Sequence, residues 1–185
     1  MSTNKKSDDA VEAAAAEEGA PDATFLVMFF AFVAIGVLSV FLDGHLPEES
    51  KPVMLLVSRV ALGIFFAGAG WAHFDESKDE LYCSMIPPLF PNPSFLHKCA
   101  GAFELAGGVG LVIPIECIRN ASAWLLICVL WGVFPANMYH VYSPEARSKL
   151  KMPLVFAWIR IAIQFVFMEW ARVHTTSSLE ELLGV

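Results

Sequence analysis

The sequence is poor in charged residues and lacks the marks of a nucleic-acid-binding protein. Only 17% of its 185 residues are Asp, Glu, Lys or Arg, whereas 56% are hydrophobic, a composition too apolar for an ordinary soluble domain. The formal net charge is -7 and the basic residues form no patch, so nucleic acid is not an expected partner. Strand-like alternation is missing too, and the apolar runs are too long for core strands, which favours an all-α fold.

Motifs of a self-sufficient enzyme are also missing. The sequence has no CxxC pair among its four cysteines, no flavin or nucleotide fingerprint, no P-loop and no nucleophile elbow. We therefore predict no catalytic residue and do not expect the chain to be an enzyme on its own. Cys83 and Cys99 are expected at the same membrane face, where they either form a disulfide or stay free.

Long apolar runs are what the sequence does contain. Each is about 20 residues long, enough to cross a hydrocarbon core of ~30 Å as a helix. The pattern predicts an integral, multi-pass membrane protein that contacts membrane lipids. The five runs are residues 24–42, 53–72, 97–115, 121–139 and 154–173.

The segments outside these runs suggest how the chain is organised. Residues 1–23 are acidic and lack aromatic residues, which predicts a disordered tail, and residues 174–185 form a C-terminal tail. The link 73–94 begins with acidic residues and ends in MIPPLFPNP, which predicts either an extended lid on the membrane surface or a rigid linker. Lys and Arg in the links favour an N-terminus on the inner side.

Charged side chains inside the apolar runs are the candidate functional residues. Each costs roughly 2.5–3.5 kcal/mol at the membrane centre, so it should face a partner on another helix. Matching depths predict one layer of Glu104 with Arg160 and Asn137, and a second layer of Arg59 with Glu169. These layers either fix the register of the helices or line a pocket for a ligand head group or a proton-linked step.

Three histidines, His73, His97 and His140, fall at the ends of runs near the Glu104 layer. With Asp75 they could bind a quinone-like carbonyl or a metal ion, but no close ligand pair such as HxxxH is present, so we predict no metal site. Pro135 lies inside the fourth run and predicts a bend there.

Small residues in the third run predict close helix packing. Ala102, Ala106 and Gly110 recur every four residues and are flanked by further glycines, so neighbouring backbones can approach each other, including those of a second copy of the chain.

Several segments between Ser58 and Ala171 resemble the DoxX-like family of small four-helix membrane proteins. They read, in order, SRVALGIFFAGAGWAHF, MIPPLFP, GAFELAGGVGLVIP, FPAN and WIRIAIQFVFMEWA. The resemblance implies a four-helix transmembrane bundle over residues 53–173, to which residues 24–42 add one N-terminal transmembrane helix. It also implies a polar core, for ligand binding or structure, made of Arg59, His73, Glu104, Asn137 and Arg160.

The resemblance leaves two main functional hypotheses open. The first is a non-catalytic subunit, or an assembly or chaperone factor, of a membrane complex, which would bind a protein partner or form a homo-oligomer. The alternative is a quinone- or lipid-binding component of a membrane oxidoreductase system, with quinone as its cofactor. A transporter is a weaker hypothesis because the sequence shows no inverted repeat.

Overall fold

The computed structural model describes residues 23–43, 45, 47, 49–149 and 153–176. The chain divides into two compact units, Met1–Ala31 and Phe32–Val185. In the first unit the described residues, 23–31, begin helix α2 (Ala23–Asp43). The predicted tail 1–23 lies outside the described residues except for its last residue, and so do residues 177–185 of the C-terminal tail.

All regular structure in the described residues is helical, which confirms the all-α prediction. Each predicted apolar run lies largely within one long helix of the chain. Among the described residues, three of these helices, α3, α6 and α8, are long and apolar enough to cross a membrane. Helices α2 and α5 do not meet both conditions over their described residues. The second unit contains, after α2, the helices α3 (Lys51–Ala72), η1 (Glu76–Lys78), α4 (Asp79–Met85), α5 (Pro93–Val112), α6 (Glu116–Tyr142), α7 (Pro144–Lys149) and α8 (Leu154–Arg172).

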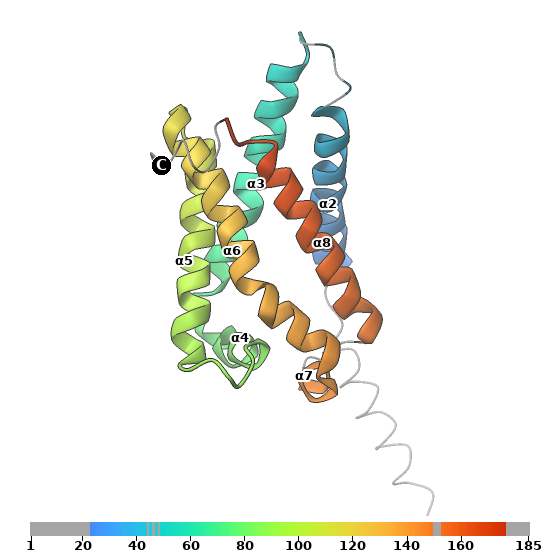
Figure 1. Cartoon of the computed structure of the whole chain (residues 1–185), viewed down its shortest axis with the longest axis vertical. Helices are drawn as coiled ribbons and strands as arrows, with labels where there is room; N and C mark the ends of the chain where they lie inside the picture. Colours follow the sequence, from blue (N-terminus) through green and yellow to red (C-terminus); the bar gives the residue numbers. More distant parts are fainter. Residues whose placement is uncertain (1–22, 44, 46, 48, 150–152, 177–185) are drawn as a thin grey trace, which may run out of the picture. The chain divides into compact units, whose positions relative to one another are not determined.

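Within the second unit, the long helices pack as a chain of neighbours. Helix α5 packs against both α3 and α6, and α6 packs in turn against α8. Figure 1 shows α6 between α5 and α8, with α4 and α7 at one end. Helix α6 therefore separates α5 from α8. This separation decides which of the predicted charge pairs can form.

Glycines bring α3 and α5 into backbone contact. A Cβ atom on Gly108 would lie 2.5 Å from the backbone nitrogen of Ala67 and 2.7 Å from the carbonyl oxygen of Gly63. Near the other end of the interface, a Cβ on Gly70 would lie 2.5 Å from the Gly101 carbonyl oxygen. Real Cβ atoms do not approach other atoms so closely, so only glycine fits here.

The predicted small-residue stripe of α5 is divided between different surfaces. Ala102 and Ala106 are exposed, whereas Gly107 and Gly110 face α6, where added Cβ atoms would meet Leu126 and Ser122. Close approach is therefore a property of the glycines and not of the alanines.

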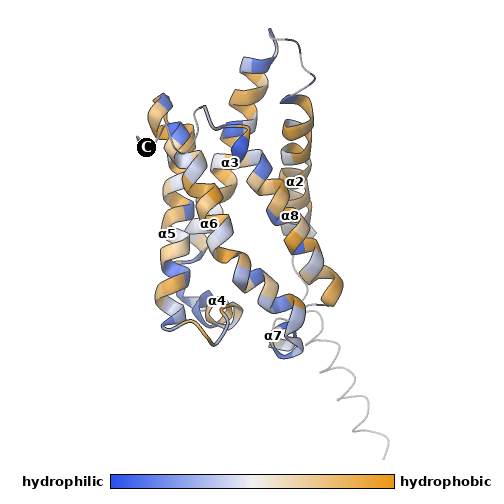
Figure 2. Ribbon diagram, viewed as in Figure 1, coloured by the Kyte–Doolittle hydropathy of each residue, from blue (hydrophilic) through white to orange (hydrophobic). Residues whose placement is uncertain are grey.

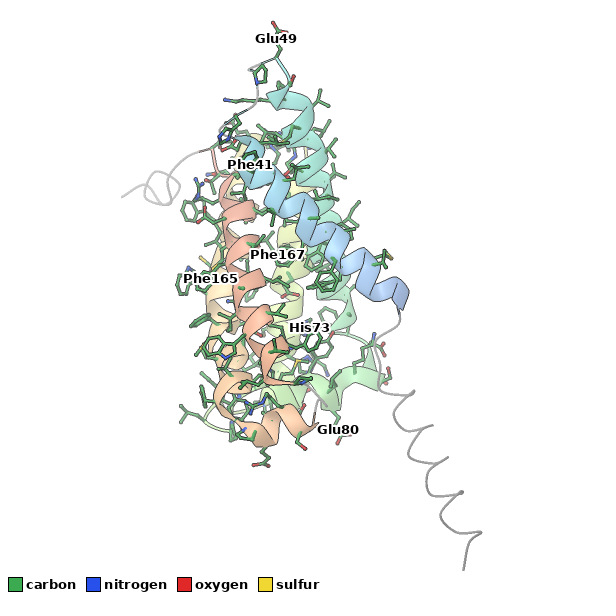
Figure 3. All side chains as sticks on the ribbon, turned by 90° about the vertical axis from the view of Figure 1, so that its right-hand side faces the viewer. Phe41, Glu49, His73, Glu80, Phe165 and Phe167 are labelled. Atoms are coloured by element: carbon green, nitrogen blue, oxygen red, sulfur yellow. The ribbon has the colours of Figure 1, made fainter. Side chains whose placement is uncertain are left out.

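Aromatic side chains connect α3 with α8. Phe167 is 5% exposed, and its ring centroid lies 4.5 Å from that of Phe65 and 5.6 Å from that of Phe66. Figure 3 shows Phe167 pointing into the bundle and Phe165 away from it. Such close packing supplies dispersion energy, which is the main source of helix association where lipid replaces water.

Hydrophobic residues dominate the long helices, and hydrophilic residues gather toward the helix ends and on α4 and α7 (Figure 2). On α3 the exposed side chains include Val53, Leu56, Val57 and Ile64, and on α8 they include Leu154, Val155, Phe156 and Trp158. This distribution is typical of a surface that contacts acyl chains.

The link 73–94, predicted as an extended lid or a rigid linker, is partly helical. Its first half is helical, because Asp75 caps η1 by accepting hydrogen bonds from the backbone nitrogen of Ser77 (3.1 Å) and its hydroxyl (2.6 Å). The proline-rich second half is not helical and ends at Asn92, whose φ of 52° and whose side chain, 3.4 Å from the backbone nitrogen of Phe95, start α5. The predicted lid is therefore non-helical only in this second half.

Candidate functional site

The main group of polar side chains lies where α4 meets the ends of α3 and α5. We call Asp79, His97, His73 and Glu104 the histidine–carboxylate cluster. Asp79 begins α4, His73 is the C-cap of α3, and His97 and Glu104 lie two turns apart on α5. His73 lies at the same end of the structure as Glu80 of α4 (Figure 3).

Asp79 is the outer end of the cluster, with 35% of its side chain exposed. Its Oδ1 lies 3.0 Å from Lys98 Nζ, 3.1 Å from the Ser94 hydroxyl and 3.1 Å from His97 Nε2. The hydrogen bond from Lys98, together with those from Ser94 and His97, lowers the pKa of Asp79 to about 2. Asp79 is therefore a carboxylate at neutral pH.

Two imidazole rings continue the cluster inward. His97 is 4% exposed, and its Nδ1 lies 3.5 Å from His73 Nδ1. Tyr82 stacks on His73 with ring centroids 4.1 Å apart and holds that ring in place. Burial, and then the neighbouring His97, lower the pKa of His73 to about 4, so this imidazole is neutral at pH 7.

Glu104 is the inner end of the cluster. Its side chain is 12% exposed, and its Oε2 lies 3.7 Å from His73 Nε2, too far for a hydrogen bond. This oxygen is buried and has no hydrogen-bond partner among the described residues. A buried carboxyl oxygen without a partner is costly, and such atoms commonly mark a site that holds a ligand or water.

The hydrogen-bonding capacity of the cluster has a direction. If His97 donates from Nε2 to the Asp79 carboxylate, its Nδ1 accepts from His73 Nδ1, and His73 Nε2 is left as an acceptor toward Glu104. A hydroxyl group placed between His73 and Glu104 could then donate to the imidazole. The geometry suits a hydroxyl head group, which would bridge the 3.7 Å gap between His73 Nε2 and Glu104 Oε2.

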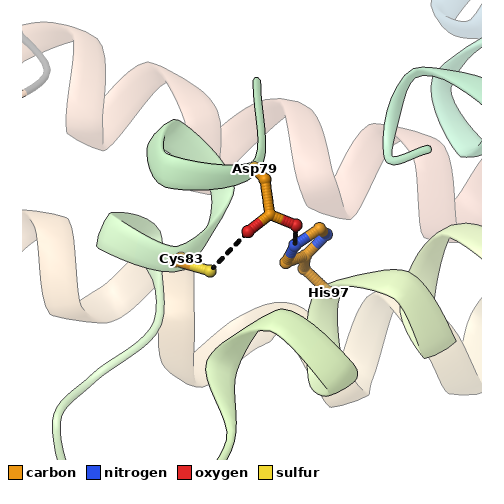
Figure 4. A group of neighbouring side chains, drawn as sticks. All are labelled: Asp79, Cys83 and His97. Atoms are coloured by element: carbon orange, nitrogen blue, oxygen red, sulfur yellow. Dashed lines mark hydrogen bonds and ion pairs between the residues drawn. The ribbon is translucent and has the colours of Figure 1, made fainter. Parts of the chain in front are cut away.

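Cys83 lies beside Asp79, one turn later on α4 (Figure 4). Its Sγ is 3.6 Å from Asp79 Oδ2, and partial burial, followed by the negative charge of Asp79, raises the pKa of the thiol. Cys83 and Cys99 are both free, so of the two sequence alternatives the structure has the unbridged one.

Arg160 and Asn137 form a second polar network, between α6 and α8. Arg160 Nη2 donates to Asn137 Oδ1 (2.8 Å), and Asn137 Nδ2 donates to Gln164 Oε1 (2.6 Å). Gln164 Nε2 in turn donates to the backbone carbonyl of Leu130 (2.5 Å). The predicted Arg160–Asn137 contact is therefore present. Helix α6, which carries Asn137, continues without interruption through Pro135.

The other predicted partner in that layer, Glu104, is not paired with Arg160. Glu104 faces His73 instead, because α6 separates α5 from α8. The prediction matched the depths of Glu104 and Arg160 along the membrane normal, but it did not take into account which helices are neighbours. The prediction of a Glu104–Arg160 ion pair is therefore wrong.

The predicted second layer, Arg59 with Glu169, is also wrong. Glu169 is 53% exposed and pairs with Arg172, three residues later on the same helix, at 2.6 Å. The Nε of Arg59 is buried and has no hydrogen-bond partner among the described residues. Next to Glu169, Trp170 faces inward and its Nε1 donates to the Ser58 hydroxyl (2.7 Å), which leaves Glu169 on the outer face.

At this end of the bundle, the segment after α8 is fixed to α3. His174 Nε2 lies 3.1 Å from Ser58 Oγ, and His174 is 7% exposed. Burial, and then the nearby Arg59 guanidinium, lower the pKa of His174 to about 4. Ser58 is only 2% exposed, so a substrate cannot reach this serine–histidine pair. The contact between the two side chains therefore has a structural role.

His140, near the end of α6, is fully buried, and neither ring nitrogen has a hydrogen-bond partner among the described residues. His140 was expected near the Glu104 layer together with His73 and His97, but the ring contact that the structure gives it is with Tyr139.

Sequence reasoning missed the outer half of the cluster. Asp79, Tyr82 and Cys83 fall in the link that was expected to be a lid or linker, so they were not considered as site residues. The available signal was the spacing of Asp79 and Cys83, which places both on one face if the link is helical.

The chain matches one family model, described as Domain of unknown function (DUF8561), over residues 62–175, more than half of its length. No curated protein and no solved structure matches the chain. The matched segment starts inside α3 and includes the whole histidine–carboxylate cluster and the Asn137–Arg160 network. The chain belongs to the DUF8561 family.

Proposed function

We propose that this chain is an integral membrane protein that binds the polar head group of a hydrophobic ligand, such as a quinone, at His73 and Glu104. It would serve as the ligand-binding component of a membrane oxidoreductase system. The observation that carries the proposal is the buried Glu104 Oε2, which has no hydrogen-bond partner among the described residues and lies 3.7 Å from His73 Nε2. A quinol hydroxyl could donate to His73 Nε2, and a quinone carbonyl could accept a hydrogen bond from the Glu104 carboxyl group when that group is protonated.

The membrane location is supported by three helices, α3, α6 and α8, that are long and apolar enough to span, and by their apolar outer surfaces. We further propose that α5 is a fourth span, so that residues 53–173 form a DoxX-like four-helix bundle, with α2 as an added N-terminal span. At 20 residues, α5 has the length to cross a bilayer, and its backbone contact with α3 supports a shared orientation.

The cluster also contains groups that could deliver protons to a bound quinone, although it contains no redox centre. Reduction of a quinone consumes protons. The imidazoles of His97 and His73 lead from the partly exposed Asp79 to within 3.7 Å of the buried Glu104, a gap that the bound head group would bridge. The electrons would come from another subunit, since the sequence contains no flavin or metal-cluster motif.

The test is mass spectrometry of the lipid extract from purified protein, combined with binding of decylubiquinone to the detergent-solubilised chain. We expect a stoichiometric quinone on the wild-type protein and its loss in Glu104→Gln, with abundance and melting temperature unchanged. Glu116→Gln, which alters an exposed carboxylate in the first turn of α6, is the matched control and should retain the ligand. A wild-type protein that neither carries a quinone nor binds decylubiquinone would overturn the proposal.

A second candidate function is an assembly or chaperone factor, favoured by an open apolar groove between α5 and α6. Its volume is about 690 Å³, and its lining includes Ala102, Ala106, Ile118, Ala121 and Leu125. Small side chains allow a helix of a protein partner, or of a second copy, to approach closely. For this function, Glu104→Gln would lower protein abundance and partner recovery together, and no ligand would be found on the wild-type protein.

A further inference from the structure

Three different metal-binding side chains converge at the outer end of the cluster. Asp79 and Cys83 are four residues apart on α4 and present a carboxylate and a thiol on one helix face, toward His97 of α5 (Figure 4). Their potential ligand atoms, one from each residue, all lie within 4.8 Å of one another. The three residues come from two helices, so the tertiary fold rather than sequence proximity assembles them.

The separations fit coordination of one ion. Asp79 Oδ1 is 3.1 Å from His97 Nε2, and Asp79 Oδ2 is 3.6 Å from Cys83 Sγ. With zinc–nitrogen and zinc–oxygen bonds of about 2.0 Å and a zinc–sulfur bond of about 2.3 Å, the edges of a tetrahedral site are roughly 3.3–3.6 Å long. These two distances involve different oxygens of Asp79, and with one ligand atom from each residue all separations are within 4.8 Å. The side chains would therefore have to draw closer by about 1 Å to share a common ion.

We propose that Asp79, Cys83 and His97 form a binding site for a divalent transition metal ion of the zinc class, separate from the His73–Glu104 head-group site. One nitrogen, one sulfur and one oxygen ligand suit Zn²⁺ and Co²⁺ and do not suit Mg²⁺ or Ca²⁺, which prefer oxygen. Three protein ligands leave the fourth position for water. The partial exposure of Asp79 gives the ion access from solvent.

The surroundings of His97 resemble those of a metal-bound imidazole. The ring is 4% exposed, and its second nitrogen, Nδ1, lies 3.5 Å from His73 Nδ1. With a metal ion on Nε2, Nδ1 would carry the N–H and donate to His73 Nδ1, the reverse of the direction in the metal-free cluster. A ligating histidine usually donates its other N–H to a group that fixes the ring orientation. Ser94, which contacts Asp79 Oδ1, would orient the carboxylate in the same way.

Lys98 gives the proposal a distinctive consequence. Its ammonium group lies 3.0 Å from Asp79 Oδ1, where it balances the carboxylate charge, and its side chain is 46% exposed. A metal ion would take over this role and displace the lysine into solvent. Removing the lysine charge should therefore strengthen metal binding, whereas it would weaken a cluster that is held together only by ion pairs.

The experiment is titration of the purified, metal-free full chain with CoCl₂, followed by displacement with ZnCl₂. We expect one Co²⁺ per chain, a thiolate-to-cobalt charge-transfer band, and loss of this band on addition of one equivalent of Zn²⁺. Cys83→Ser should remove the band, whereas Cys99→Ser, the control at another free and partly buried cysteine, should keep it. Lys98→Gln should lower the dissociation constant for Co²⁺ severalfold.

Several results would overturn the metal site. These are a wild-type protein without the band, a band that persists in Cys83→Ser, or a Lys98→Gln protein that binds Co²⁺ more weakly than the wild type. The Lys98 and wild-type measurements do not depend on whether Cys83→Ser folds. They also involve no quinone, so failure here leaves the head-group proposal intact, and failure of that proposal leaves the metal site intact.

Discussion

The guanidinium of Arg160 is held by the amide of Asn137, at 2.8 Å from Nη2 to Oδ1, and not by the carboxylate of Glu104. A neutral amide thus takes the role expected of an acid, and it passes a hydrogen bond on to Gln164. This leaves the Glu104 carboxyl group free for the ligand that we propose.

Asn137→Ala tests this network. The substitution leaves the Arg160 guanidinium and Gln164 Oε1 without their partner inside the helix bundle, so we expect a loss of about 2 kcal/mol in the free energy of unfolding. The measurement is denaturant unfolding in detergent. Ser84→Ala is the control, since that exposed hydroxyl donates only to the Leu81 carbonyl of its own helix, and equal losses in the two variants would contradict the network.

Gly108→Ala tests the backbone contact between α3 and α5. The added methyl group would lie 2.5 Å from the Ala67 nitrogen, and backbone cannot move aside as a side chain can, so we expect a loss of about 2 kcal/mol or more. Gly68→Ala is the matched control, because nothing lies within 4 Å of its Cβ and helix propensity alone should add ~0.5–1 kcal/mol. The thermal midpoints of the two variants should shift in opposite directions.

His174 should make stability depend on pH. Its folded-state pKa of about 4 lies below the ordinary value of 6.5, so the unfolded chain takes up the proton first as the pH falls. The stability from neutral His174 is complete above about pH 6.5 and is lost progressively down to about pH 4, by at most about 3 kcal/mol. Unfolding of the wild type and of His174→Gln, measured across this range, isolates the effect, and identical pH profiles would count against it.

Glu169→Gln should change the free energy of unfolding by less than about 0.5 kcal/mol. The carboxylate is 53% exposed and pairs only with Arg172 on its own helix, and exposed pairs of this kind contribute little. The result is read from the same unfolding curves. A loss of several kcal/mol would restore the buried Arg59–Glu169 pair that the sequence predicts.

Apolar periodicity and length were enough to predict the long helices from the sequence, because runs of about 20 apolar residues have few alternatives to a helix. The charge partners were harder to predict. Depth along a helix follows from counting residues, and it placed Asn137 and Arg160 together correctly. Lateral position does not follow from counting, so Glu104 was paired with Arg160 of α8, whereas it faces His73 at the end of α3.

The outer half of the cluster was missed for a different reason. Whether the acidic link folds into a helix depends on a local cap at Asp75 and on packing against α5, and neither is visible in hydropathy. Once α4 forms, Asp79 and Cys83 reach His97 through ordinary helical spacing. The Asp75 cap, together with the four-residue spacing of Asp79 and Cys83, is the sequence feature that indicates their position.

The glycine contacts between α3 and α5 have a consequence for the site they carry. Two backbones that touch at Gly63–Gly108 and at Gly70–Gly101 can neither roll nor slide without collision. His73 ends one of these helices, and His97 and Glu104 lie on the other, so the backbone contact fixes the distance between the His73 imidazole and the Glu104 carboxyl group. A ligand bound between these two side chains must therefore fit the existing separation, because the helices cannot move closer together around it.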